Sequence, residues 1–329
     1  MAYIQREPPL IPLDGVVPPA DGSSAAALPD PLPARMRPLK ARHGGPVADC
    51  ERASLYFRPR DGKHTLMLKI ATWNINSVRL RIGMVCRFLA EAKPDVLCLQ
   101  EIKCRDGEFP AKAFKEAGYE HMHVVGQKGW HGVAIVSRVK LEPVEAPAIC
   151  PKKEARIAAA LIDGVEVHNL YVPAGADVPE LTNPKFVHKL NVLDKMKTLY
   201  KKRKGKTPTV LVGDLNVAPG EFDVWSHKQL LNVVSHTPGE TDRLNAVRDL
   251  GGFVDLARAH KPDPEKLFTW WSYRSPDWTK NNRGRRLDHI WATDDVAVTS
   301  QAAAFHIHVP VRSWERPSDH VPVVAGFKL

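Results

Sequence analysis

From Met67 onward, the chain alternates apolar runs of strand length with segments of helical periodicity, and this alternation limits the folds that it can adopt. The first two runs read LKIATWNI and DVLCLQ, and residues 79–92 between them fit an amphipathic helix. The next four runs follow one another through short turns and read YEHMHVV, GVAIVS, RIAAALI and VEVHNLYV. Such closely spaced strands favour antiparallel pairing.

The second half of the chain continues the alternation. Pro184 opens a helix with apolar residues at helical spacing, and the run TVLVGDLN then returns to a strand. Residues 287–291 and 321–327 have the pattern of the last strands. This order predicts an α/β fold: two mixed, mostly antiparallel sheets packed face to face with helices outside, as a four-layer α/β/β/α sandwich.

Residues 1–66 differ from the rest in composition, because proline, alanine, glycine and serine dominate them. Such a segment buries too little apolar surface to offset the entropy of ordering, so we predict a disordered extension at 1–66 and a folded domain at 67–329. The run MLKIATWNIN has the pattern of a natural domain beginning. Two alternatives stay open: a genuine tail, or a given start that lies upstream of the real one.

The chain is basic, with a net charge of +10 and an isoelectric point near 9.4. This balance favours polyanionic partners such as nucleic acid, although general basicity without such a partner would look the same. The most basic stretch, KKRKGK at 201–206, follows the long helix. We interpret it as a solvated loop rather than a DNA contact.

Cysteine usage bears on the compartment. The five cysteines include no CxxC pair, which argues against a disulfide framework or a cysteine zinc site and for a reducing compartment. No apolar run approaches the roughly 18 residues of a membrane span, and the first residues do not resemble a secretory signal. We therefore expect a cytoplasmic protein without a membrane partner.

Acids, amides and a histidine recur where the predicted strands meet solvent. The pair Asp214 and Asn216 in GDLN is typical: taken alone, it is an ordinary turn or a helix cap. In an antiparallel sheet, the end of one strand lies beside the beginning of its neighbour, so side chains distant in sequence can share one rim. The residues in question are Asn74, Asn76, Glu101, Tyr171, Asp214, Asn216, Asp288, Asp319 and His320.

This set of side chains is rich in hard oxygen ligands. Oxygen donors without cysteine suit Mg²⁺ or Mn²⁺ better than zinc. A divalent ion near a phosphate neutralises developing charge, while a carboxylate activates a water for in-line attack. Asp288 and His320 are candidates for a pair in which the acid orients the histidine beside a phosphate oxygen. The residues alone therefore predict a metal-dependent phosphoester hydrolase.

Eight motifs in order make the chain, from about Met67 to Leu329, resemble the exonuclease III and abasic-site (AP) endonuclease family, within the endonuclease/exonuclease/phosphatase superfamily. Each motif is weak alone, but their order and separations are specific. They are TWNIN (72–76), LQEIK (99–103), GQKGWHGVAI (126–135), YVPAG (171–175), GDLNVAP (213–219), TWWSYRS (269–275), NNRGRRLDHI (281–290) and SDH (318–320).

The resemblance implies metal ligands and catalytic residues. Glu101 would be the main magnesium ligand, with Asn74 and Asp319, and Asn76 would support the same ion. If a second ion binds, its ligands would be Asp214, Asn216 and His320, and the sequence does not decide between one ion and two. In catalysis, Asp214 would activate the water, Asn216 would hold water or phosphate, Tyr171 would contact the phosphate, and His320, oriented by Asp288, would stabilise the transition state.

The resemblance also implies double-stranded DNA as the partner of a DNA-repair enzyme, and a monomer is the default expectation. Trp270, Trp271 and Leu287 match positions near a pocket for an extruded sugar, where aromatic rings can stack on bases. For one of the two tryptophans, core packing is the expected alternative. Lys128, together with the loop Gly129–Gly132, would touch the DNA backbone, with a plain turn as the alternative.

Departures from the common family pattern suggest a preference among activities. Ser77 replaces a common glycine, Ala174 removes a polar side chain, and Arg285 replaces an apolar pocket residue. His227, in a predicted loop, would bar a flipped abasic sugar while leaving a frayed 3′ end accessible. We expect a Mg²⁺-dependent phosphodiesterase with 3′→5′ exonuclease and 3′-end-cleaning activity exceeding incision at abasic sites.

Two other function classes are alternatives to this expectation. One is a phosphatase of the same fold that acts on a small-molecule or lipid phosphoester. The other is a catalytically inactive nucleic-acid binding module, which predicts losses among the acidic residues, and none of them is lost.

Overall fold

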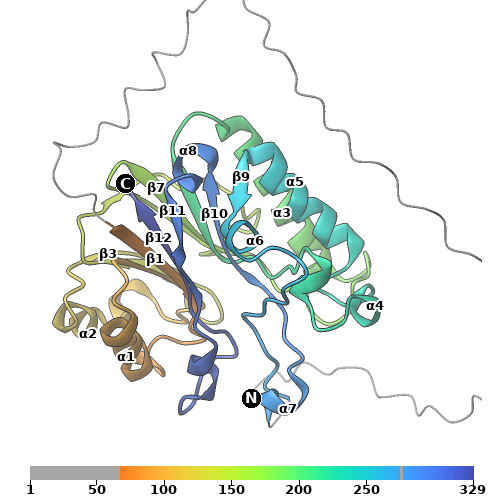
Figure 1. Cartoon of the computed structure of the whole chain (residues 1–329), viewed down its shortest axis with the longest axis horizontal. Helices are drawn as coiled ribbons and strands as arrows, with labels where there is room; N and C mark the ends of the chain where they lie inside the picture. The colour runs from red at the N-terminus through yellow and green to blue at the C-terminus, as the bar shows by residue number, and fades with distance from the viewer. Residues whose placement is uncertain (1–66, 275–276) are drawn as a thin grey trace, which may run out of the picture. The chain divides into compact units, whose positions relative to one another are not determined.

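The computed structural model describes residues 67–274 and 277–329 (Figure 1). The extension predicted at 1–66 lies outside the described residues. Two six-stranded sheets form the centre of the domain. The first has the order β11-β12-β1-β2-β4-β3 and the second β5-β6-β7-β8-β10-β9. The predicted α/β fold with two mixed sheets is confirmed.

The two sheets are built as follows. The first contains β1 (Met67–Asn74), β2 (Val96–Gln100), β3 (His121–Val125), β4 (Val133–Ser137), β11 (Ser300–Ile307) and β12 (Val323–Lys328). The second contains β5 (Glu142–Pro143), β6 (Ile157–Ile162), β7 (Val165–Tyr171), β8 (Thr209–Asp214), β9 (Phe253–Asp255) and β10 (Asp288–Thr293). The pairs β1–β2 and β7–β8 are parallel, and the other named pairs are antiparallel.

Helices cover the outer faces of both sheets (Figure 1). On β1, Ile70 belongs to a core cluster shared with residues of the second sheet, whereas Trp73 belongs to a cluster shared with helix residues such as Phe88. This division follows from the two-residue period of a strand, which sends alternate side chains to opposite faces. The α-helices are α1 (Ile82–Ala92), α2 (Ala111–Glu116), α3 (Pro184–Arg203), α4 (His227–Leu230), α5 (Pro238–Gly251), α6 (Leu256–His260), α7 (Trp278–Asn281) and α8 (Asp294–Ala297).

Helix α3 begins where the sequence predicts, because Asn183 accepts a hydrogen bond from the Lys185 amide at 3.0 Å and Pro184 fits the first turn. Three other local predictions need correction. The first helix starts at Ile82 rather than residue 79, since a turn precedes it. Half of the KKRKGK stretch lies in the last turn of α3 rather than in a loop. His227 opens the short helix α4, with Ser226 as its cap.

Across the described residues, none of the helices combines the length and the apolar character needed to cross a membrane.

Candidate active site

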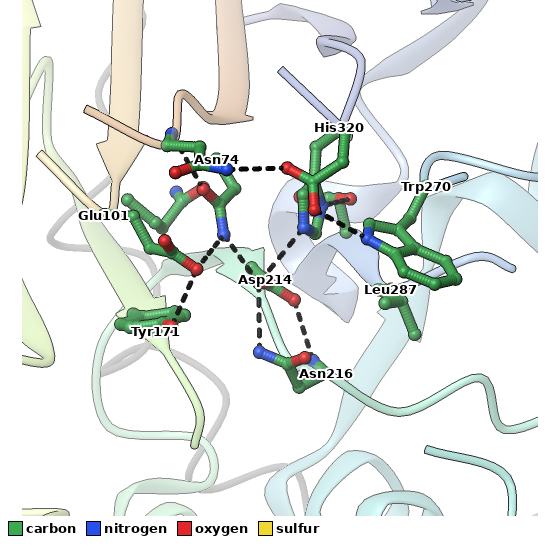
Figure 2. A network of polar contacts seen from close by, with 12 residues as sticks. Asn74, Glu101, Tyr171, Asp214, Asn216, Trp270, Leu287 and His320 are labelled. Atoms are coloured by element: carbon green, nitrogen blue, oxygen red, sulfur yellow. Dashed lines mark hydrogen bonds and ion pairs between the residues drawn. The ribbon is translucent and has the colours of Figure 1, made fainter. Parts of the chain in front are cut away.

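The strand-end residues predicted from the sequence converge at one edge of the two sheets (Figure 2). Asn74 ends β1 and Asp214 ends β8, while Asp288 begins β10 and pairs with Asp214 in register. The sequence predicts this convergence from antiparallel pairing alone. The parallel pairs β1–β2 and β7–β8 also bring side chains together, because parallel strands end at the same edge. We call the nine residues the polar cluster: Asn74, Asn76, Glu101, Tyr171, Asp214, Asn216, Asp288, Asp319 and His320.

Asn74 joins the two sheets within the polar cluster. Its Nδ2 donates to Glu101 Oε1 at 3.0 Å and to Asp214 Oδ2 at 2.9 Å. The Tyr171 hydroxyl donates to the same Glu101 oxygen at 2.7 Å. Glu101 itself has a φ of 50°, a left-handed conformation that is uncommon for a glutamate. The carboxylate is thus held by side chains from β1 and β7 on a strained turn just after β2.

Lys103 belongs to this arrangement, although sequence reasoning assigned it no role. Its Nζ lies 2.9 Å from Glu101 Oε2 and donates to Asn76 Oδ1 at 2.6 Å. The only available signal was its place in the LQEIK motif, two residues after Glu101. An ammonium between two predicted metal ligands shows that this part of the cluster attracts cations.

Asp319 is fixed from two sides. It accepts hydrogen bonds from Asn76 Nδ2 at 3.1 Å and from the indole of Trp270 at 3.0 Å. Burial opposes ionisation of this carboxyl, but the charge of His320 and these two hydrogen bonds outweigh it and lower the pKa. Asp319 is therefore a permanent anion at neutral pH.

Asp288, His320 and Asp214 form a line of titratable groups. His320 Nδ1 lies 2.8 Å from Asp288 Oδ2, which also accepts from the Thr269 hydroxyl at 2.6 Å. His320 Nε2 lies 3.7 Å from Asp214 Oδ2. Burial alone would lower the pKa of His320, but the Asp288 and Asp214 carboxylates raise it, so the imidazolium persists at neutral pH. Burial raises the pKa of Asp214, while the His320 charge opposes that rise.

Asp214 and Asn216 form a turn and also belong to the candidate active site. The Asn216 amide donates to Asp214 Oδ1 at 2.9 Å, and its Nδ2 donates to Asp214 Oδ2 at 3.0 Å. This is a side-chain-stabilised turn, with Asn216 at a φ of 53°. The same contacts orient a carboxylate that is only 1% exposed, and Asp214 caps none of the described helices.

A buried ion pair between α3 and α5 supports this turn, and the sequence does not predict it. Lys189, on α3, donates to the Asn216 carbonyl at 2.7 Å and pairs with Glu240 of α5 at 2.5 Å. Both side chains are fully buried. A lysine within a helix such as α3 is normally predicted to be exposed. The local sequence therefore does not indicate this contact.

The polar cluster has the donor set of a hard-metal site. Glu101, Asp214 and Asp319 offer carboxylate oxygens, which Mg²⁺ and Mn²⁺ prefer. Ligand atoms of Asp214, Asp288 and His320 also lie within 4.8 Å of one another. Among the described residues, Asp288 Oδ1 is a buried oxygen without a hydrogen-bond partner. The carboxylates of Glu101, Asp214 and Asp319 fit a divalent cation at the predicted ligands, whereas the unpartnered oxygen belongs to Asp288, which is predicted to orient His320.

Three of the predicted DNA-contacting residues lie beside the polar cluster. Trp270 is partly buried and packs against a small apolar group that includes Leu287 and Leu230 of α4 (Figure 2). The Arg285 guanidinium lies 5.3 Å from the centre of the Trp270 ring. The guanidinium also donates to Ser235 Oγ at 2.9 Å. It therefore places a charged group next to the apolar residues.

The other three predicted DNA-contacting residues, His227, Trp271 and Lys128, lie in different surroundings. His227 Nδ1 lies 2.8 Å from His236 Nε2. His227 belongs to α4, and Leu230 of the same helix packs against Leu287. Trp271 is 3% exposed and packs against Phe268 and Trp278, so the core-packing alternative applies to it. Lys128 is exposed in the connection between β3 and β4.

Comparisons with known proteins agree with this geometry. A model of the endonuclease/exonuclease/phosphatase family matches residues 71–320. Exodeoxyribonuclease III of Haemophilus influenzae is 30% identical over 273 residues, which cover 79% of this chain and 100% of that protein. The structure of an AP endonuclease from Archaeoglobus fulgidus matches with a TM-score of 0.74 at 36% identity, over 80% of this chain and 100% of that one. A 3′ phosphatase from Neisseria, solved with a product DNA hairpin, matches with a TM-score of 0.72 at 32% identity, again over 80% and 100%.

Proposed function

This chain belongs to the endonuclease/exonuclease/phosphatase family, and we propose that it is a metal-dependent DNA-repair phosphodiesterase of the exonuclease III type. The observation that carries the proposal is the meeting of Glu101, Asp214, Asp319 and His320 in one hydrogen-bonded cluster. Relatives named exodeoxyribonuclease III and AP endonuclease support the same reaction class. A cytoplasmic location and a monomeric state remain predictions.

We assign the metal to Glu101, Asn74 and Asp319, with Asn76 in support. When bound, Mg²⁺ or Mn²⁺ would supply positive charge to a phosphate oxygen on which negative charge develops. Lys103 contacts Glu101 and Asn76, so its ammonium contributes to the same positive field. The Tyr171 hydroxyl, whose pKa burial and the Glu101 and Asp214 charges raise, stays protonated and can donate to Glu101 or to a substrate oxygen.

Asp214 is the group we assign to the attacking water. Asn74 and Asn216 hold its carboxylate in one orientation, and its raised pKa makes it a stronger base than an exposed aspartate. The water oxygen would bond to phosphorus while the P–O3′ bond breaks. The imidazolium of His320, held by Asp288, would stabilise the charge that builds on the phosphate.

The surroundings of Trp270 support a preference for 3′ ends over abasic sites. Leu287 and Trp270 would offer apolar surface, but Arg285 places a guanidinium against the same ring and His227 sits on the adjacent helix α4. An abasic sugar within a duplex would have to be extruded into this space, whereas a frayed 3′ end would approach Asp214 from the end of the strand. We therefore propose 3′→5′ exonuclease and 3′-end cleaning as the main activities, and incision at abasic sites as the slower one.

The test is a side-by-side assay with Mg²⁺ on matched duplexes that carry a recessed 3′ end, a 3′ phosphate or an abasic site. Cleavage should require the metal, stop with a chelator, and be fastest at 3′ ends. Faster incision at the abasic site would refute the order of activities, and no cleavage of any duplex would refute the function.

His227 allows a sharper version of this test. His227→Ala should raise incision at the abasic site relative to 3′ trimming several-fold, because it removes an imidazole from α4, the helix that packs beside Leu287 through Leu230. Lys228→Ala changes an exposed neighbour on the same helix and serves as the control. An unchanged ratio of the two rates in His227→Ala would contradict the blocking role.

A further inference from the structure

A second cluster of metal-binding side chains lies outside the polar cluster. Cys150 and Glu154 belong to the connection between β5 and β6, and His188 faces them from α3. Cys150 Sγ lies 3.7 Å from His188 Nε2 and 3.9 Å from Glu154 Oε2, and the last two atoms are 3.4 Å apart. We call these three residues the Cys150 cluster. The polar cluster does not include any of them.

The spacing of these three atoms matches one face of a tetrahedral zinc site. With bonds of about 2.3 Å to sulfur and about 2.0–2.1 Å to nitrogen or oxygen, ligand atoms around Zn²⁺ lie roughly 3.3–3.6 Å apart. The observed distances are within a few tenths of an ångström of these values. Three ligands from two chain segments would reach the ion with little rearrangement.

Charge and hydrogen bonding also suit a metal. Burial lowers the pKa of His188, so its ring is neutral near pH 7 and can present a lone pair. Burial opposes ionisation of Glu154, but its hydrogen bond to Arg156 outweighs this and lowers the pKa. Arg156 Nε donates to Glu154 Oε2 at 2.6 Å, which is the kind of outer contact that orients a ligating carboxylate. His131 Nε2 lies 3.8 Å from Oε1, the other carboxylate oxygen of Glu154.

We infer that Cys150, Glu154 and His188 bind a divalent cation of the zinc class, distinct from the cation of the polar cluster, with water as the fourth ligand. A thiolate and an imidazole select Zn²⁺ or Co²⁺ over Mg²⁺. The sequence predicts no cysteine zinc site because the chain contains no CxxC pair. This site needs one cysteine, with partners that the fold supplies.

The position of the site connects it to the polar cluster. Arg156, which holds Glu154, also donates to the Tyr171 carbonyl at 3.2 Å, and its guanidinium lies 4.9 Å from the centre of the Tyr171 ring. Tyr171 in turn donates to Glu101. A metal at the Cys150 cluster would therefore fix the segment that positions Tyr171.

The test is a cobalt titration of the full-length, metal-free protein in excess Mg²⁺, followed by absorption spectroscopy. We expect one equivalent of Co²⁺ to give tetrahedral visible bands and a thiolate-to-cobalt charge-transfer band, both abolished by one equivalent of Zn²⁺. Cys150→Ser should lose the charge-transfer band, and His188→Ala should weaken cobalt binding by about tenfold or more.

Two matched variants serve as controls. Cys86→Ser changes another partly exposed cysteine, on α1, and Glu101→Ala alters the polar cluster; both should keep the band. Circular dichroism would verify that each variant is folded. If the parent protein shows no charge-transfer band, or the band survives in Cys150→Ser, the inference is overturned. Neither outcome bears on DNA cleavage, so this test is independent of the proposed function.

Discussion

At the scale of single residues, Asp288 shows how a side chain can act through a neighbour. Its Oδ2 lies 2.8 Å from His320 Nδ1 and accepts a hydrogen bond from the Thr269 hydroxyl. We predict that Asp288→Asn lowers kcat by roughly 10- to 100-fold, as expected for an outer partner of a functional group. The residual activity should depend more steeply on pH above neutrality, because an imidazolium without its carboxylate loses its proton more readily.

Steady-state kinetics over a range of pH measure this effect. Thr269→Val tests the same pair from the other side and should give a smaller loss. A kcat of Asp288→Asn equal to that of the parent would contradict the positioning role.

The sequence reveals residues of one chemical kind that recur at several strand ends. Asp214 and Asp319 are ordinary turn formers when taken singly, but they belong to a set that a sheet can bring to one rim. Lys103, Lys189 and Thr269 do not stand out, since their partners lie far away in sequence and their types are ordinary in helices and loops. Contacts of this kind become visible only when the fold brings the partners together.

At the scale of elements, helices α3 and α5 support the turn after β8. Lys189 of α3 reaches the Asn216 carbonyl, and Glu240 of α5 holds Lys189. Lys189→Met should leave the buried Glu240 carboxylate without its cation and lower the free energy of unfolding by about 3–5 kcal/mol. It should also reduce kcat, because Asn216 loses its support.

Urea unfolding and DNA-cleavage kinetics measure both effects, with Lys195→Met, an exposed lysine of the same helix, as the control. Equal unfolding free energies for the two variants would show that the buried pair does not stabilise the turn.

The strands that carry the site could be predicted, whereas several other elements could not. The strands β1, β2, β7 and β8 are short apolar runs with clear ends, so their limits follow from composition. Helix α5 was missed even though TPGE at 237–240 is a start signal: Glu240 accepts from the Thr237 amide at 3.2 Å in a capping box. The strand β11 contains three consecutive alanines and a single buried residue, Phe305, so its pairing with β12 leaves little trace in the sequence.

At the scale of the whole molecule, a buried ionic network joins distant parts of the second half. Asp223 accepts two hydrogen bonds from Arg286, at 2.7 and 2.8 Å, and also pairs with Arg258. Burial opposes ionisation of Asp223, but the two arginines outweigh it and hold the pKa well below its usual range. The resulting stability is present above the unfolded-state pKa of about 3.9 and is lost as the pH falls below it.

The Asp223→Asn variant tests this linkage. At pH 7 it should be less stable than the parent by about 3–5 kcal/mol, because Arg286 and Arg258 lose a buried anion. At pH 3 the difference should shrink, since Asp223 takes up a proton in the unfolded parent, which lowers the parent's free energy of unfolding. Urea unfolding at both pH values gives the comparison. A difference that does not change with pH would contradict the assigned source of stability.

The net charge of +10 bears on the choice between DNA and a small phosphoester as substrate. If the protein contacts several DNA phosphates, its affinity for a duplex should fall steeply and linearly in a plot of log affinity against log salt concentration. Fluorescence anisotropy with a labelled duplex measures this slope. A nearly flat slope, with efficient cleavage of a small phosphoester, would instead favour a phosphatase of the same fold.

The most direct test of the central claim is the turnover of Asp214→Asn on a recessed-3′ duplex at saturating Mg²⁺, measured together with DNA binding. The substitution keeps the shape of the side chain but removes the base that we assign to the attacking water. We predict a loss of turnover of about 10²- to 10⁴-fold, the range for removing a general base, with DNA affinity within a few-fold of the parent. Turnover close to that of the parent would contradict the account.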